Sequence, residues 1–314
     1  MRSNATAPPR RQHHYVEASD VASAVAAMRD GARPIAGGTD LVVGARHGKA
    51  PLPDSLVGIH RIAGLGAIDQ LADGGLRLGA LVSHATLEAH PAVVSGYTGV
   101  ADASAIVGSH ATRATGTLGG NVMNASPAMD TGAPLLCHNG VAVLVGPSGE
   151  RRVALADLWV SPGRTSAAPD ELLVAVELAP ASSADGTTSG SAYVRLQYRR
   201  QMEIAIVGAG AVVTLAADGT VAQTRIAITA LAPVIHRVPE AEAAFVGSDG
   251  GFGAAKNAGS LAAAAARPIS DVRGSANYRT AMAAVITRRA LLTAVRRARG
   301  EHVPVPASDT TFGS

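Results

Sequence analysis

Two short segments of this chain share a pattern that limits how the backbone around them can fold. Each is a pair of glycines flanked by hydroxyl, amide or carboxylate side chains, at residues 36–41 (AGGTDL) and again at 117–121 (TLGGN). Glycine has no Cβ, so the chain can turn tightly there and approach another group closely. Successive backbone N–H groups in such a loop can also point together at an anion. We predict that the two segments clamp one long, phosphate-bearing ligand.

The side chains around the glycine pairs supply further polar groups for such a ligand. The first pair follows a short apolar strand predicted at residues 33–36, where backbone N–H groups can meet a phosphate. Thr39, Thr117 and Asn121 add side-chain donors, and Asp130 is a candidate acceptor for a ribose or ribityl hydroxyl. The alternative for each glycine pair alone is an ordinary turn, and for Asp130 a surface or helix-capping aspartate.

The cysteine content restricts the chemistry that the chain can carry. Cys137 is the only cysteine among 314 residues, so an intrachain disulfide, an iron–sulfur cluster and a cysteine-ligated zinc site are excluded. We expect no metal ion in this chain, and a cytoplasmic location. The sequence has no serine-hydrolase, Walker or metal-ligand motif, so no residue is assigned a catalytic role. A bound cofactor would have to carry any redox chemistry.

The charge distribution argues against two classes of partner. The net charge is only +3, and much of the excess lies at residues 288–299, near the end of a predicted helix. Basic residues there complement the helix dipole or form a docking surface. No aromatic side chains are interleaved with them for base stacking, so nucleic acid is not expected as a partner. No apolar run is long enough to span a membrane.

Short strands and helices follow one another without regular βαβ alternation, which predicts an α+β fold. One segment, residues 206–213 (IVGAGAVV), resembles the glycine-rich motif of dinucleotide-binding folds. Val213 replaces its third glycine and a turn at Asp218-Gly219 replaces the helix, so we interpret it as a core strand. A Ser/Gly-rich stretch at 181–191 predicts a linker between two domains. The expected first domain covers residues 15–180, with subdomains at about 15–60 and 61–180, and a smaller α+β domain covers residues 192–300. A disordered tail is expected at 1–14 and a loose tail at 301–314.

These residues together resemble the FAD-binding medium subunit of molybdenum hydroxylases, the family of xanthine dehydrogenase, aldehyde oxidoreductase and carbon monoxide dehydrogenase. Residues 36–41 are similar to the first FAD loop of that family, and residues 114–121 with Asp130 to the second. Similar segments recur at 169–173, 193–207 and 277–291, so the resemblance covers roughly residues 15–295.

The resemblance implies an FAD site and assigns residues to it. Arg195 stands where the family usually has a lysine that contacts FAD, which keeps the charge but changes its geometry. Loss of Asp130 is expected to weaken FAD binding without unfolding the chain. The implied cofactor-binding residues are Pro34, Ile35, Ala36, Gly37, Gly38, Thr39, Asp40, Leu41, Thr117, Leu118, Gly119, Gly120, Asn121, Asp130, Leu173 and Arg195.

The family resemblance also implies a fold, partners and a function. The fold would be a two-subdomain FAD-binding domain of the flavin dehydrogenase type, followed by a small α+β domain. The chain would pass electrons from the [2Fe–2S] clusters of a small subunit through FAD to an external acceptor, while a large subunit carries molybdopterin. Some members hold a [4Fe–4S] cluster in this subunit, which one cysteine cannot bind. The alternatives are a stand-alone FAD-dependent oxidoreductase and a non-catalytic basic interaction module.

Overall fold

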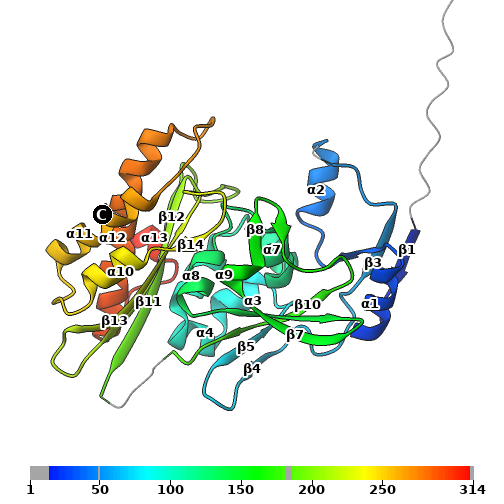
Figure 1. The fold of residues 1–314 in the computed structure, drawn as a ribbon, viewed down its shortest axis with the longest axis horizontal. Coiled ribbons are helices and arrows are strands. Elements are labelled where there is room, and N and C mark those ends of the chain that lie inside the picture. The colour runs from blue at the N-terminus through cyan, green and yellow to red at the C-terminus, as the bar shows by residue number, and fades with distance from the viewer. Residues whose placement is uncertain (1–13, 49, 182–185, 312–314) are drawn as a thin grey trace, which may run out of the picture.

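The computed structural model describes residues 14–48, 50–181 and 186–311, and three sheets lie in a row within these ranges (Figure 1). Mixed helices and sheets of this kind confirm the predicted α+β class. No helix in the described ranges combines the length and the apolar character needed to cross a bilayer.

The first sheet is small and parallel, in the order β1-β3-β2. Helix α1 packs on it through buried Ala24, Val25 and Met28. Asp20 caps the helix, because its carboxylate accepts from the Ser23 N–H. The elements are β1 (His14–Glu17), α1 (Val21–Arg29), β2 (Arg33–Ile35), α2 (Leu41–Arg46) and β3 (Ser55–Gly58).

The second sheet is antiparallel, in the order β4-β5-β10-β6-β7. Its central strand β10 is buried along its whole length, and Glu177 is the one charged residue in its otherwise apolar sequence. Leu172 and Val174 pack in the core shared with the first sheet, whereas Leu173 and Val176 pack in the main core on the opposite side. The strands are β4 (Ile68–Gln70), β5 (Leu76–Gly79), β6 (Val141–Gly146), β7 (Gly149–Ala154) and β10 (Leu172–Leu178).

Several short helices connect these strands and cover the inner face of the second sheet, and the β8–β9 hairpin lies beside them (Figure 1). They are α3 (His84–Ala89), α4 (Pro91–Gly96), α5 (Thr98–Ala105), α6 (His110–Thr115), α7 (Leu118–Asn124), α8 (Gly132–Cys137) and α9 (Leu155–Leu158), with β8 (Trp159–Ser161) and β9 (Arg164–Thr165).

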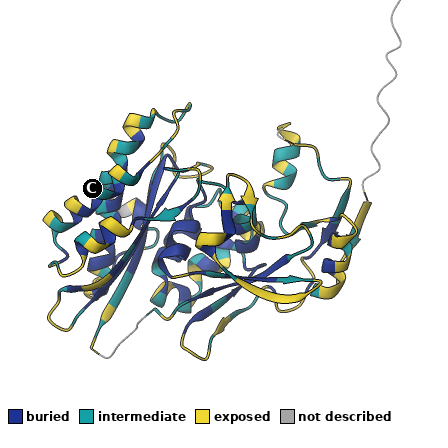
Figure 2. Ribbon diagram, viewed as in Figure 1, coloured by how far each residue is buried: buried dark blue, intermediate teal, exposed yellow. Residues whose placement is uncertain are grey.

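The third sheet is antiparallel, in the order β11-β12-β13-β14. It lies between α10 and α12 on one side and α5 and α8 on the other, so its strands are mostly buried, whereas β7 is exposed (Figure 2). Strand β12 is the core strand predicted from residues 206–213, and Gly210 lets α8 pack closely, since a Cβ would lie 3.0 Å from the Ala133 carbonyl carbon. The elements are β11 (Thr188–Leu196), β12 (Val207–Leu215), β13 (Val221–Thr229), β14 (His236–Arg237), α10 (Pro239–Phe245), α11 (Phe252–Ala265), α12 (Ala276–Ala298) and α13 (Ala307–Thr311).

Three expectations about segment boundaries are wrong. Residues 301–311 are not a loose tail, because Val303, Ala307 and Ser308 are buried and the Ser308 hydroxyl accepts from the Arg195 N–H at 3.0 Å. The last four residues of the linker predicted at 181–191 belong to β11, which begins at Thr188. The tail predicted at 1–14 is one residue too long, because His14 begins β1 and pairs with Ser55 of β3. Residues 1–13 and 182–185 lie outside the described residues.

Asp102, on α5, holds the last two sheets together from the buried seam between them. Its side chain has no solvent exposure, and its oxygens accept from the Arg297 guanidinium at 2.6 and 3.0 Å. They also accept from the backbone N–H groups of Tyr193 at 3.0 Å and Ala307 at 2.9 Å. Burial raises the pKa of Asp102, opposed by Arg297 and these N–H donors. One carboxylate therefore fixes β11, α12 and the C-terminal segment on α5.

Replacement of Asp102 by asparagine is expected to weaken the seam strongly. It would leave Arg297 buried without a counter-charge, a change that costs about 3–5 kcal/mol. Urea unfolding monitored by circular dichroism would measure this loss. Glu301→Gln is the matched control, because it makes the same chemical change in the exposed pair with Arg296, where about 1 kcal/mol or less is expected. Equal losses in the two variants would contradict the assignment.

Candidate functional site

The two glycine segments, far apart in sequence, lie against each other. A Cβ at Gly37 would overlap the backbone carbonyl of Thr115, just before the second segment. A Cβ at Gly116 would lie 3.4 Å from the Thr39 hydroxyl of the first segment. Gly38 has φ +68°, a left-handed conformation that favours glycine. The first glycine pair is therefore required both for a turn and for contact between the two loops.

The first loop presents backbone donors that the protein itself leaves unused. Among the described residues, the N–H groups of Gly37, Gly38 and Thr39 have no hydrogen-bond acceptor. The loop leads into α2, where the Val42 N–H donates back to the Gly38 carbonyl at 2.9 Å. Three consecutive half-buried donors at this turn suit an anionic group.

The second loop is built differently, and one expectation about it is wrong. The Gly119 N–H donates to the Ala80 carbonyl at 2.8 Å, and the Gly120 N–H donates to the Thr117 hydroxyl at 3.1 Å. Thr117 thus caps α7, and these backbone donors are already occupied. A Cβ at Gly119 would lie 2.7 Å from the Ala80 Cβ, so this glycine serves internal packing. The second loop can therefore contact a ligand through its side chains and through the exposed Gly120.

Asn121 supplies the side-chain donor of the second loop. Its Oδ1 accepts from the Thr131 hydroxyl at 2.7 Å, so the Nδ2 amino group is the end of the amide that remains to donate. Thr131 is fully buried and adjacent to Asp130 in sequence. Sequence reasoning missed Thr131, because its contact joins α7 to the start of α8.

Asp130 and Arg195 meet in a buried cluster. Arg195 Nη1 donates to Asp130 Oδ2 at 2.7 Å, and the Tyr193 hydroxyl donates to Oδ1 at 2.8 Å. Gln197 Oε1 accepts from the Arg195 Nε at 2.9 Å and also from its Nη2. Burial raises the pKa of Asp130, opposed by the charge of Arg195 and the Tyr193 hydroxyl. Sequence reasoning missed Tyr193, although residues 193 and 195 must share one face of a strand.

The partners of Asp130 correct one expectation. Both of its oxygens already accept hydrogen bonds from the protein, and its loss would leave Arg195 buried without a counter-charge. Such a change costs several kcal/mol. Loss of Asp130 would therefore disturb the fold as well as any ligand.

The remaining predicted residues lie around these groups. Leu118 and Leu173 have buried side chains in the main core, so only their backbones can face a ligand. Leu173 is nevertheless close to the second loop, since the next carbonyl, of Val174, accepts from the Ala80 N–H. Pro34 and Ile35 lie on β2, Ala36 and Asp40 complete the first loop, and Leu41 begins α2.

His84 is a further buried group that sequence reasoning did not assign to the site. Its backbone N–H donates to the Gly116 carbonyl at 3.1 Å, and its Nδ1 has no hydrogen-bond partner. Burial, reinforced by the charge of Arg113, lowers its pKa to about 4, so the imidazole is neutral at pH 7. The backbone of His84 therefore holds the Gly116 carbonyl at the start of the second loop, and its neutral imidazole adds no charge there.

Comparison with known proteins identifies this arrangement. Residues 10–181 match the FAD binding domain in molybdopterin dehydrogenase, and residues 192–294 match the CO dehydrogenase flavoprotein C-terminal domain. The chain belongs to the FAD-binding medium subunits of the molybdenum hydroxylase family. It is a flavoprotein subunit of an oxidoreductase, which confirms the resemblance seen in the sequence.

Named relatives align over nearly their whole length. The 6-hydroxypseudooxynicotine dehydrogenase complex subunit alpha of Paenarthrobacter nicotinovorans is 31% identical over 91% of this chain and 95% of its own. The carbon monoxide dehydrogenase medium chain of Afipia carboxidovorans is 30% identical over 91% of this chain and 97% of its own. The structure of carbon monoxide dehydrogenase from Hydrogenophaga pseudoflava matches with a TM-score of 0.84 and 31% identity, covering 93% of this chain and 99% of that one.

The contact between the two loops can be tested by adding one methyl group. Gly37→Ala places a Cβ on the Thr115 carbonyl and should cost about 1–3 kcal/mol of strain, which separates the loops and weakens FAD binding. Titration of the flavin-free protein with FAD, followed by flavin fluorescence, measures the effect. Gly44→Ala is the control, because nothing lies within 4 Å of its Cβ and alanine favours the α2 helix. Unchanged FAD affinity in Gly37→Ala would show that FAD binding does not depend on contact between the two loops.

Proposed function

We propose that FAD lies extended across the two glycine loops and reaches the Asp130–Arg195 cluster. The observation that carries the proposal is the row of three unused N–H donors at Gly37, Gly38 and Thr39, held against the second loop in a chain of an FAD-binding family. The proposed contacts are the residues assigned from the sequence, with Leu118 and Leu173 acting through their backbones.

Different residues would contact the two ends of FAD. The free N–H groups of the first loop and the Asn121 Nδ2 would donate to the pyrophosphate, which carries negative charge and favours such charge-assisted bonds. Asp130, Tyr193 and Arg195 form a pre-arranged polar cluster where β11 meets α8, and they would hold the far end of the cofactor. Because these groups are already held by one another, little ordering would be needed when FAD binds.

The proposal includes a role in electron transfer within a larger assembly. When bound, FAD would supply the redox chemistry by taking electrons from the [2Fe–2S] clusters of a small subunit and passing them to an external acceptor. A large subunit would carry molybdopterin and select the substrate. A cytoplasmic location remains a prediction from the cysteine content. Affinity purification from the native host with metal analysis tests the assembly, since iron and molybdenum should co-purify. Flavin-loaded protein without either metal would favour the stand-alone oxidoreductase.

Asn121→Asp is the sharpest test of the FAD site. The new carboxylate can still accept from Thr131, so the fold should remain, but it removes the Nδ2 donor and repels the pyrophosphate. Loss of a charge-assisted bond of about 3 kcal/mol corresponds to roughly 100-fold weaker FAD binding. Isothermal titration with FAD gives the affinity, and Asn257→Asp on exposed α11 is the control for the added charge. Equal affinity in the two variants would refute this placement of FAD.

A further inference from the structure

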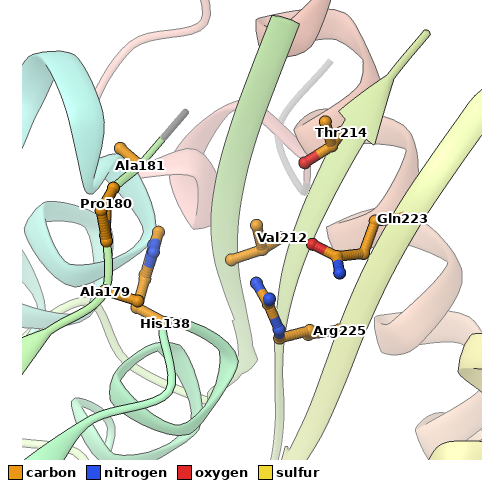
Figure 3. Close-up of a pocket in the computed structure, with 8 residues that line it drawn as sticks. All are labelled: His138, Ala179, Pro180, Ala181, Val212, Thr214, Gln223 and Arg225. Carbon is orange, nitrogen blue, oxygen red and sulfur yellow. The ribbon is translucent and has the colours of Figure 1, made fainter. Parts of the chain in front are cut away.

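A small cavity lies on the seam between the FAD-binding part and the C-terminal sheet, away from the glycine loops. It has a volume of about 30 Å³. Figure 3 shows His138 and residues 179–181 on one side, and Val212, Thr214, Gln223 and Arg225 of β12 and β13 on the other. One water needs about 10–15 Å³, so the space suits one small ion and not a phosphate-bearing metabolite.

Arg225 brings a positive charge to this cavity, and Glu242, whose charge favours it, is already paired with Arg237. In the described ranges its half-buried guanidinium makes no hydrogen bond or ion pair. Glu242, the acid of this region, is occupied by Arg237, with contacts of 2.8 and 2.6 Å. Burial, and then the charge of Arg237, lower the pKa of Arg225, opposed by the charge of Glu242. Binding of an anion would stabilise the charged form of a half-buried guanidinium that lies near a like charge.

His138 is a second unsatisfied group at the same cavity. It is 3% exposed, and its Nε2 has no hydrogen-bond partner. Tyr97 packs on the ring, with 4.8 Å between centroids. Burial, helped by the charge of Arg225, lowers the pKa of His138 to about 3, so the ring is neutral and has one N–H to donate. The Cys137 thiol alongside is also neutral, because burial raises its pKa to about 12.

We propose that this cavity binds one small monovalent anion, of the size of chloride, between Arg225 and His138. The Gln223 amide lines the same space and is the third donor, whereas the Thr214 hydroxyl is already paired with Ser189 at 2.7 Å. The anion would neutralise Arg225 and join the end of α8 to β13. It would therefore strengthen the seam at the end of α8 opposite Asp130.

Thermal unfolding of the full-length, FAD-loaded chain tests the proposal. Sodium chloride replaces sodium gluconate at constant ionic strength, because gluconate is too large for the cavity. At ten times its dissociation constant, chloride should raise the Tm of the wild type by about 3 °C. Arg225→Gln should remove this rise, and in gluconate it should be at least as stable as the wild type, since it relieves the repulsion from Arg237. Arg164→Gln, on exposed β9, should keep the full rise.

Crystals soaked in bromide provide an independent reading of the same site. An anomalous peak within hydrogen-bond distance of the Arg225 and His138 side chains is expected, and it should be absent in Arg225→Gln. If Arg225→Gln does not fold, His138→Phe keeps the ring packed on Tyr97 and should still reduce the chloride effect. A Tm rise that survives both substitutions, or a cavity without bromide in the wild type, would overturn the proposal.

Discussion

The buried carboxylate of Asp102 is the contact on which the arrangement of the site depends. It binds Arg297 of α12 and the backbone of β11 and of the C-terminal segment, so it fixes where β11 lies relative to α5. Tyr193, whose N–H it accepts from, then reaches Asp130 with its hydroxyl. Arg195, two residues along the same strand, reaches the other oxygen of Asp130. The far end of the proposed FAD site is therefore made by the same strand that closes the seam.

The two glycine loops differ in what their glycines do. Gly37 allows the loops to touch, and Gly38 makes the turn at which three N–H groups have no acceptor among the described residues. Gly119 instead packs against Ala80 and uses its N–H inside the fold. The same sequence pattern thus gives a backbone donor loop in one place and a rigid platform for a side-chain donor, Asn121, in the other. This division follows from long-range packing, which the local sequence does not contain.

Local patterns predicted a large part of the fold. The short strand before the first glycine pair, β2, and the small-residue strand β12 were each predicted from the pattern of their own segment. The errors concern contacts between distant segments. The partners of Asp130 lie more than 60 residues away, and the segment after residue 300 is held by Asp102, Arg195 and Arg297, which are also distant or on another element. Both glycine loops were recognised from their local sequence pattern, but which of their N–H groups lack an acceptor depends on Ala80 and Thr117.

The central claim is that the first loop binds FAD with its backbone and the second with a side chain. Hydrogen–deuterium exchange of the purified chain, with and without FAD, tests this difference directly. FAD should slow exchange at residues 37–39, whose N–H groups have no acceptor in the described protein, and should change little at Gly119 and Gly120, which are already bonded. New protection at Gly119 and Gly120 without any at residues 37–39 would contradict the account.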